Sequence, residues 1–456
     1  MADPKAAPKP NPALRMLGLP NLPRKLPSRN WMIFWSISTT LAAAIIYDKR
    51  EKKRATARWA KAVEPLSREL LSDTSAMPRR VTVYLEAPPG DGLRAAQDHF
   101  KEYIKPVLAS SGLDWEFVVG RRQGDVRAVV AERVRRTRRA DHTDAGMTQP
   151  AEGDAPTDDD VVATVRQRNG IPEYSGVKGD IVVGRHTWKE YVRGLHEGWL
   201  GPLTAPVVPV VEKKVEANTS TDAAASTQEG AAPSDGSSTT PPTPEKPEPP
   251  KDDSAPKRPP QPVPYNSVDD YPSSPLPRLI PAELGPSSPI PFPHLLGFLN
   301  TPIRIYRFLN RRRTADEIGR EVAAVCFATG TREYREAAAL GADDGCEQQT
   351  VLIHEEKDWA KSVWKDSKED LEADPTLATK ERPWRNPVVV DPRIGQRMRR
   401  FELTPSDEAT ARAIKVPEEE IEGWTKGMFR KLGRWAVGKW RGDGKFKPNV
   451  DNLDGE

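Results

Sequence analysis

The sequence predicts an α/β protein with a single N-terminal transmembrane helix and a Rossmann-like domain built on a parallel sheet. Three observations lead to this prediction. An uncharged apolar stretch lies near the N-terminus, strand-like and helix-like segments then alternate, and a Pro- and Ser-rich tract precedes a second region of α+β character. Alternating strands and helices are typical of a parallel sheet with crossover helices.

The anchor is predicted at residues 31–47, after an N-terminal arm of residues 1–30. This stretch of about 17 residues has no charge, and as a helix it is about 25 Å long, the lower limit for crossing a bilayer. Aromatic rings near its ends suit the headgroup level. A basic run follows where a signal-peptide cleavage site would need small residues, so an uncleaved anchor is expected. The residues expected to hold the anchor in the membrane are Trp31, Trp35, Ile45, Ile46 and Tyr47.

Charge does not decide the orientation of the anchor. Basic residues lie on both sides, in the arm and in the membrane-proximal segment 48–79. Acidic residues count for little in the positive-inside rule, so neither side is favoured. Within residues 48–79 the stretch Thr56–Leu71 is predicted to form a helix interrupted at Pro65.

The α/β domain is predicted at residues 80–205, with an acidic loop at residues 141–160. Its β-branched and aromatic runs predict strands, and its amphipathic segments predict crossover helices. The expected strands are Arg80–Glu86, Asp114–Val119 and Asp180–Gly184. The expected helices are Leu93–Ser110, Asp125–Arg139, Val161–Asn169 and Thr187–Gly198.

Residues 211–262 form the Pro- and Ser-rich tract, which predicts a disordered linker because it has almost no large apolar side chains. The α+β region is predicted at residues 264–441, and a tail at 442–456. Its apolar segment Ile290–Asn310 contains arginines and is expected to dock rather than to span. The expected helices are Thr314–Phe327 and Lys357–Leu371, and the expected strands are Thr350–His354, Val388–Asp391 and Arg400–Leu403.

Composition limits the kinds of site. The chain of 456 residues has 69 basic and 66 acidic groups, a balance that argues against binding nucleic acid through bulk charge. The two cysteines, Cys326 and Cys346, and six scattered histidines do not have the spacing of metal ligands, so neither a metal nor a cofactor is expected. No catalytic triad or carboxylate pair stands out, so no catalytic residue is assigned.

The run of arginines from Arg133 to Arg139 ends a predicted helix, where cations suit the helix dipole. We expect it to be a solvated face, with contact to anionic lipid as the alternative. Near the C-terminus, apolar residues recur at helical spacing between basic ones, which predicts an amphipathic helix that lies on lipid, binds a partner or packs on its own domain. These residues are Trp424, Met428, Leu432 and Trp435.

The order RVTVYLEAPPGDG, IKPVLASSGLDWEFVV and GDIVVGRHTWKEYVRGL resembles the catalytic domain of lipid and diacylglycerol kinases. The glycine-rich nucleotide loop of that family, GGDGT, is replaced here from Gly184 by Gly-Arg-His-Thr-Trp. The resemblance therefore implies a kinase-like scaffold that has lost catalysis. The turn APPGDG at residues 87–92 could face a phosphate, but it lacks the lysine and hydroxyl of a P-loop, which favours a plain turn.

A second resemblance extends over both folded regions. The chain resembles the subunit-fifty-four family of the fungal mitochondrial inner-membrane translocase for carrier proteins, the twenty-two complex. The resemblance is carried by PSRNW at the start of the anchor, by the basic residues that follow the anchor and by YLEAPPGDG. The resemblance implies a scaffold or receptor without catalysis, with its N-terminal arm in the matrix and its bulk in the intermembrane space. Its implied partners are the channel-forming subunit, other subunits, small intermembrane-space chaperones and membrane lipids. The alternatives are a membrane-anchored lipid-kinase-like protein and an endoplasmic-reticulum protein glycosylated at Asn218.

Overall fold

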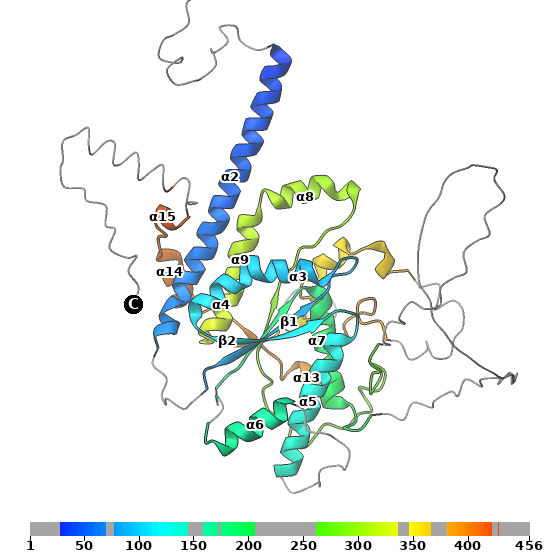
Figure 1. The fold of residues 1–456 in the computed structure, drawn as a ribbon. Coiled ribbons are helices and arrows are strands. Elements are labelled where there is room, and N and C mark those ends of the chain that lie inside the picture. The colour runs from blue at the N-terminus through cyan, green and yellow to red at the C-terminus, as the bar shows by residue number, and fades with distance from the viewer. Residues whose placement is uncertain are drawn as a thin grey trace, which may run out of the picture.

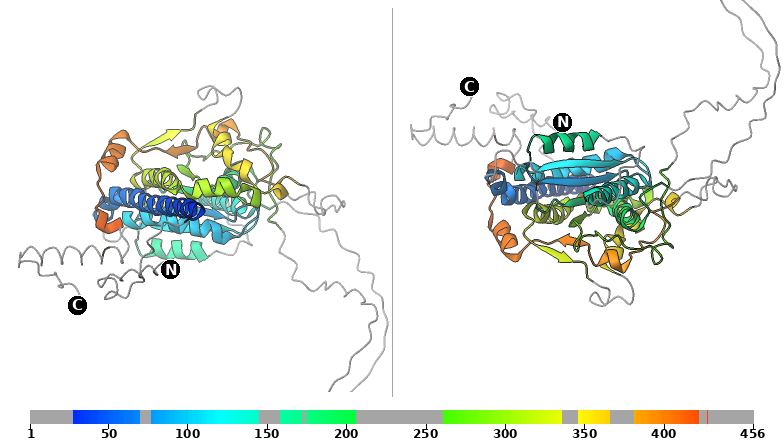
Figure 2. Two further views of the ribbon diagram at one scale, coloured as in Figure 1. Left: turned by 90° about the horizontal axis from the view of Figure 1, so that it is seen from above. Right: turned by 90° about the horizontal axis from the view of Figure 1, so that it is seen from below.

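The fold is a six-stranded sheet with helices on both faces, and a long helix projects from it (Figures 1 and 2). The computed structural model describes residues 28–69, 77–144, 158–171, 174, 176–205, 261–335, 346–365, 381–421 and 427. Most of the predicted linker and the predicted arm lie outside these residues, as do the whole of the tail and the four apolar residues of the predicted C-terminal amphipathic helix.

The sheet combines strands from both predicted regions. The strands are β1 (Arg80–Glu86), β2 (Asp114–Gly120), β3 (Asp180–Val183), β4 (Ser287–Ile290), β5 (Thr331–Glu333) and β6 (Arg399–Phe401). Their order is β2-β1-β3-β4-β6-β5, and all neighbours are parallel except β5 and β6. The predicted parallel sheet is confirmed for the first three strands. Residues beyond 264 extend this same sheet, so the two predicted regions share one sheet and its core.

Helices form two layers around the sheet. One face is covered by α2 (Arg29–Val63), by the continuous helix α3–η2–α4 (Leu93–Ser111) and by α9 (Arg311–Phe327). The other face is covered by α5 (Asp125–Asp144) and α7 (Arg185–Leu200), together with loops from residues 265–285 and 388–398. Apolar residues that alternate along β1 and β3 point into these two cores, as the period of a strand requires.

The remaining elements are short. They are η1 (Glu64–Arg68), α6 (Asp158–Arg168), η3 (Phe298–Asn300), α8 (Thr301–Phe308), α11 (Glu347–Thr350), η4 (Ile353–Asp358), η5 (Lys361–Val363), α13 (Pro392–Gly395), α14 (Pro405–Ala413) and α15 (Glu418–Ile421).

Three predicted elements are wrong. No strand forms at Thr350–His354, because a helical turn ends at Thr350 and Leu352 adopts a left-handed conformation with a φ of 56°. No strand forms at Val388–Asp391, where the Asp391 N–H donates to the His196 side chain instead of a neighbouring strand. The predicted helix Lys357–Leu371 is replaced over its described part by the short 3-10 turns η4 and η5.

The predicted anchor and the predicted membrane-proximal helix are continuous with each other. Both belong to α2, which runs without a break from Arg29 to Val63. Pro65 lies just beyond the end of α2, in the first turn of η1, where a missing N–H costs little.

Candidate functional site

The N-terminal half of α2 projects beyond the rest of the protein (Figure 1). Among the described residues, α2 is the one helix that is long and apolar enough to cross a membrane, and none of its apolar stretch is buried. Of the anchor residues, Trp31, Trp35, Ile46 and Tyr47 are each more than half exposed. The hydroxyl groups of Thr39 and Thr40 donate to backbone carbonyls one turn back, at 2.7 Å, so they need no water.

The folded part meets α2 at the end of this apolar stretch. The Arg312 guanidinium, in the first turn of α9, lies 5.3 Å from the centre of the Tyr47 ring. The same guanidinium lies 3.7 Å from the buried carboxylate of Asp48. Further along, Lys52 pairs with Glu102 of the helix α3–η2–α4. The first residues after the apolar stretch are therefore already part of the packed structure.

Two turns later α2 enters the main core. Trp59 is 2% exposed and its indole N–H donates to the Asp316 carboxylate of α9 at 2.7 Å. A Cβ atom placed on Gly319 would lie 2.3 Å from this ring, so only glycine allows the two helices to approach so closely. Val63, at the end of α2, is fully buried in the same core. The predicted anchor and these core residues thus belong to one continuous helix.

The carboxyl ends of the parallel strands are the position where folds of this class bind their ligands. Here the chain itself occupies that position. The Glu355 carboxylate accepts hydrogen bonds from the backbone N–H of Arg185 at 2.9 Å and of Phe292 at 2.6 Å. Arg185 is the first residue of α7, where a helix N-terminus would favour a phosphate. Burial raises the pKa of Glu355 to about 7, although both N–H donors act in the opposite direction.

Other residues close the same crevice. Trp384 packs against the His186 ring, with ring centres 6.0 Å apart, and its carbonyl accepts from the Lys189 ammonium at 2.7 Å. His186 in turn hydrogen-bonds the Glu86 carbonyl at 3.1 Å. The residues that stand in place of the kinase nucleotide loop are therefore bonded to their own chain.

The turn at residues 87–92 is also packed. Gly90 has a φ of 86°, and a Cβ placed there would lie 3.0 Å from Leu296 and 3.2 Å from Ala360. The backbone N–H of Asp91 donates to the Pro88 carbonyl at 3.1 Å, which closes a simple turn. This geometry agrees with the plain-turn interpretation.

A buried carboxylate pair lies beneath the crevice, and the sequence analysis missed it. Glu86 and Glu190 are both fully buried. Glu190 accepts from the backbone N–H of Gly124 at 2.6 Å, and the Glu86 and Glu190 side chains are hydrogen-bonded to each other. Burial, and then the neighbouring Glu190 carboxyl, raise the pKa of Glu86 well above its ordinary value. We infer that Glu86 is held as the neutral acid, which removes the cost of burying two like charges.

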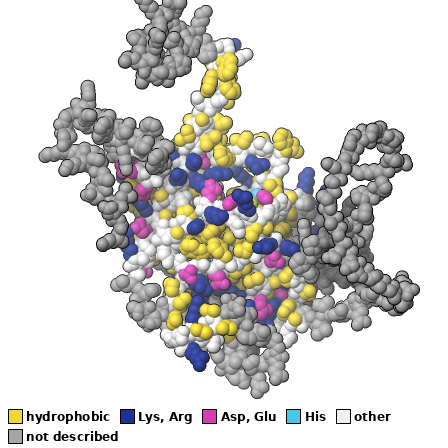
Figure 3. Space-filling model, in the orientation of Figure 1, with side chains coloured by type: hydrophobic (Ala, Val, Ile, Leu, Met, Phe, Trp, Pro, Cys, Tyr) yellow, Lys and Arg dark blue, Asp and Glu magenta, His cyan; other side chains and the backbone are white. Residues whose placement is uncertain are grey.

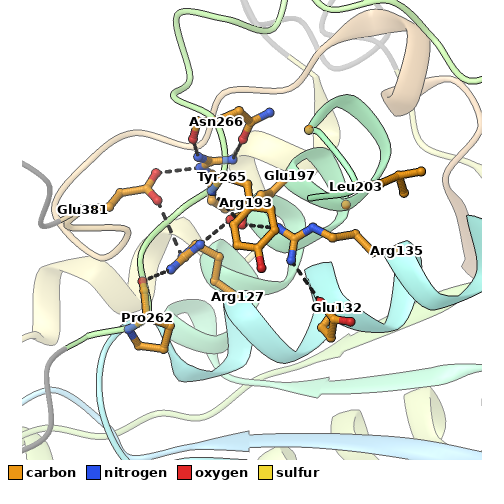
Figure 4. Close-up of polar contacts among 12 residues, drawn as sticks. Arg127, Glu132, Arg135, Arg193, Glu197, Leu203, Pro262, Tyr265, Asn266 and Glu381 are labelled. Carbon is orange, nitrogen blue, oxygen red and sulfur yellow. Dashed lines mark hydrogen bonds and ion pairs between the residues drawn. The ribbon is translucent and has the colours of Figure 1, made fainter. Parts of the chain in front are cut away.

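The arginine run of α5 is solvated only in part, because Arg133 is exposed whereas Arg135 is almost fully buried. Figure 4 shows the buried network that it joins. Glu197 of α7 accepts from Arg127 and, at 2.5 Å, from Arg135, and both arginines are almost fully buried. Arg193 donates to Glu381 at 2.6 Å.

The network also reaches the chain that follows the Pro- and Ser-rich tract. The guanidinium of Arg135 stacks on the Tyr265 ring, 3.5 Å from its centre, and the backbone N–H of Tyr265 donates to the Glu197 carboxylate at 3.1 Å. The Pro262 carbonyl accepts from Arg127. A buried arginine network of this kind ties the returning chain to the α5–α7 pair, and it leaves these cations unavailable to lipid.

A cavity of about 630 Å³ lies on the same helix pair but at the amino ends of β3 and β4. It is an open hollow lined by Tyr84, Arg133, Asp180 and Tyr191. The Tyr191 hydroxyl donates to the Asp180 carboxylate at 2.7 Å, and Arg133 donates to the Tyr84 hydroxyl at 3.0 Å. Its polar groups are thus bonded to one another rather than directed at an empty centre.

Comparison with known proteins gives relatives with one and the same subunit name, and they match almost the whole chain. The family model described as inner membrane protein import complex subunit Tim54 matches residues 11–401. The mitochondrial import inner membrane translocase subunit tim54 of Neurospora crassa is 52% identical, over 97% of this chain and 91% of that protein. The protein of the same name from Aspergillus oryzae is 43% identical, over 96% of this chain and 99% of its own length. The Saccharomyces cerevisiae subunit TIM54 is 28% identical, over 87% of this chain and 95% of its own length.

Proposed function

Because the chain belongs to the Tim54 family of inner membrane protein import complex subunits, we propose that it is a scaffold of the mitochondrial translocase that inserts multispanning carrier proteins. It acts without catalysis of its own. Its N-terminal arm lies in the matrix, and its folded part holds the channel-forming subunit and the small chaperones of the intermembrane space in register.

One observation carries the proposal: α2 continues without a break from the apolar stretch into the core. A flexible tether would only keep the folded part near the membrane, whereas a continuous helix sets the direction in which each face points. Trp59 and Val63 are core residues and Asp48 is already buried at the boundary, so the folded part cannot swivel on its anchor without breaking packed contacts. A fixed orientation is what a scaffold between membrane-embedded and soluble partners needs.

The crevice supports the absence of catalysis in the proposal. Glu355 occupies the helix N-terminus where a nucleotide phosphate would bind, and Trp384 covers His186 beside it. The alternative of a lipid kinase therefore requires these segments to leave. Phosphorylation of lipid by the purified full-length protein with ATP and Mg²⁺ would reverse the choice.

The scaffold proposal is tested by changing the helical phase of α2. Alanines are inserted after Ala44, within the apolar stretch, so that every contact of the folded part stays intact. Each inserted residue turns the folded part by about 100° relative to the arm. One or two alanines should abolish assembly of the complex on native gels, while four alanines, a net turn of about 40°, should restore part of it. Equal assembly of all three variants would contradict a fixed scaffold.

The orientation is tested separately by protease access. In intact mitochondria the folded part should be protected, and rupture of the outer membrane alone should expose it. Protection in both samples would place the folded part in the matrix and overturn the proposed orientation.

A further inference from the structure

The segment from η3 to α8 exposes an unusual amount of apolar surface. Phe298 and Leu299 are 90% and 91% exposed, although both are large apolar side chains. Ile303, Ile305 and Tyr306 of α8 are also about half exposed or more. Clustered exposure of this kind marks an interaction surface, because isolated apolar residues on a surface need no explanation but a contiguous group does.

This surface lies at the level where the protein leaves the membrane. The helix α8 ends at Phe308, and α9 begins three residues later at Arg311. The next residue, Arg312, contacts Tyr47 and Asp48, the last residue of the apolar stretch of α2 and the first charge after it. The end of α8 is therefore held beside the point at which α2 passes from apolar to charged.

The figures show how α8 is directed from this point. It lies across the top of the folded part, on the side from which the apolar half of α2 projects (Figure 1). In the space-filling view, hydrophobic side chains cover the projecting part of α2 and reappear over α8, with Lys and Arg side chains just below them (Figure 3). This arrangement matches the layers of a bilayer surface.

The charge of the segment points the same way. Residues 284–315 contain no acidic residue, but they contain five arginines: Arg304, Arg307, Arg311, Arg312 and Arg313. Three of these pair with acidic residues of the folded part, as in the bond of 2.6 Å from Arg307 to Asp358. Arg304 is exposed among the apolar side chains. Long basic side chains on an apolar helix reach up to lipid phosphates while their stems stay in contact with apolar groups.

We propose that η3 and α8 lie in the headgroup region of the same bilayer that α2 spans, with Phe298 and Leu299 inserted among the acyl chains. The occupant of this surface is lipid, because the surface continues the membrane boundary of α2, and the segment that forms it has five arginines and no acidic residue of its own. Together α2 and α8 form two points of attachment, which set the tilt of the folded part as well as its distance from the membrane. The proposal requires that α2 spans the bilayer, and it stands whether or not the protein is a scaffold.

The test measures depth in a full-length protein that carries one label. Cys326→Ala and Cys346→Ser leave Leu299→Cys as the labelling site for the fluorophore NBD, and the protein is placed in nanodiscs of phosphatidylcholine and phosphatidylglycerol. Val165→Cys in α6 is the matched control, since Val165 is 50% exposed and α6 lies at the opposite end of the folded part (Figure 1). An interfacial helix sits about 5–10 Å deep, so lipids brominated high on the acyl chain should quench position 299 several-fold more than position 165.

Two further measurements keep the test decisive. Phe298→Glu in the same labelled protein should lower the quenching at position 299 towards the control value, and circular dichroism should stay unchanged because Phe298 is exposed. Equal quenching at positions 299 and 165 would show that α8 lies in water and would overturn the proposal. The proposal would also be overturned if brominated lipid did not quench position 299 and this position became protected from an aqueous quencher only when a protein partner was added.

Discussion

Removal of the Trp59 side chain tests whether α2 is a core element or a mere tether. Trp59→Ala deletes a side chain that is 2% exposed and packed against Gly319, together with a hydrogen bond to Asp316. Truncation of a buried tryptophan costs about 3–5 kcal/mol, because the cavity does not fully collapse. For a folded part of this size, each kcal/mol lowers the melting temperature by about 2–4 °C, so we expect a loss of about 6–20 °C.

Pulse proteolysis of the full-length protein in nanodiscs across a urea series measures the loss of unfolding free energy, and thermal melting of the same sample measures the shift in melting temperature. Trp31→Ala is the matched control, since Trp31 lies in the same helix but is 56% exposed, within the candidate span. The control should change the unfolding free energy by no more than about 0.5 kcal/mol. If Trp59→Ala behaves like the control, α2 does not contribute to the core, and the rigid coupling on which the proposed function depends is refuted.

Three further predictions concern the α5–α7 pair and the buried side chain of His99. Gly198→Val should lower the unfolding free energy by about 1–3 kcal/mol, because a Cβ at this position would lie 2.5 Å from the Val134 side chain. Urea unfolding measures this loss, and an unchanged midpoint would contradict the close contact between the two helices. Glu197→Gln should cost about 3–5 kcal/mol, since it leaves buried arginines uncompensated, whereas Glu64→Gln in an exposed ion pair should cost less than about 1 kcal/mol in the same assay. Burial lowers the pKa of His99 to about 4, so just below pH 6.5 the unfolded chain binds a proton on this side chain and the folded chain does not. The free energy that neutral His99 contributes to folding is present above pH 6.5 and is lost as the pH falls to about 4. His99→Phe should therefore flatten the pH dependence of the unfolding free energy over that range. A profile parallel to that of the unchanged protein would disprove the assignment.

Local sequence patterns were sufficient for most elements that run through the core. The β-branched and aromatic residues of Arg80–Glu86 predicted β1 with the bounds that the structure shows, because a strand buried on both faces needs such residues. The spacing in Thr314–Phe327 predicted α9 to within one turn. The same method failed at Thr350–His354, since a short apolar run fits a buried turn as well as a strand. Val351 is buried while Ile353 is half exposed, and neither pairs with a strand.

The contacts of the candidate site could not be found in this way. Glu355 lies 170 residues from Arg185, and no local pattern marks a glutamate that will cap a distant helix. Arg135 and its neighbours have the spacing of a solvated basic face. Only the position of Glu197 on α7, 62 residues away, brings Arg135 into a buried network.

By itself the sequence determined the candidate membrane span, the parallel strands and the family resemblance, because each depends on residues that are neighbours along the chain. The apolar stretch before Asp48 is costly to leave in water whatever the rest of the chain does, and the strand–helix alternation follows from local periodicity. Tertiary structure decided that the helix of the candidate span continues into the core, that one sheet unites both regions and that Glu355 and Trp384 cover the carboxyl ends of the strands. Those features depend on contacts between distant segments, whose free energy arises only when the chain is packed.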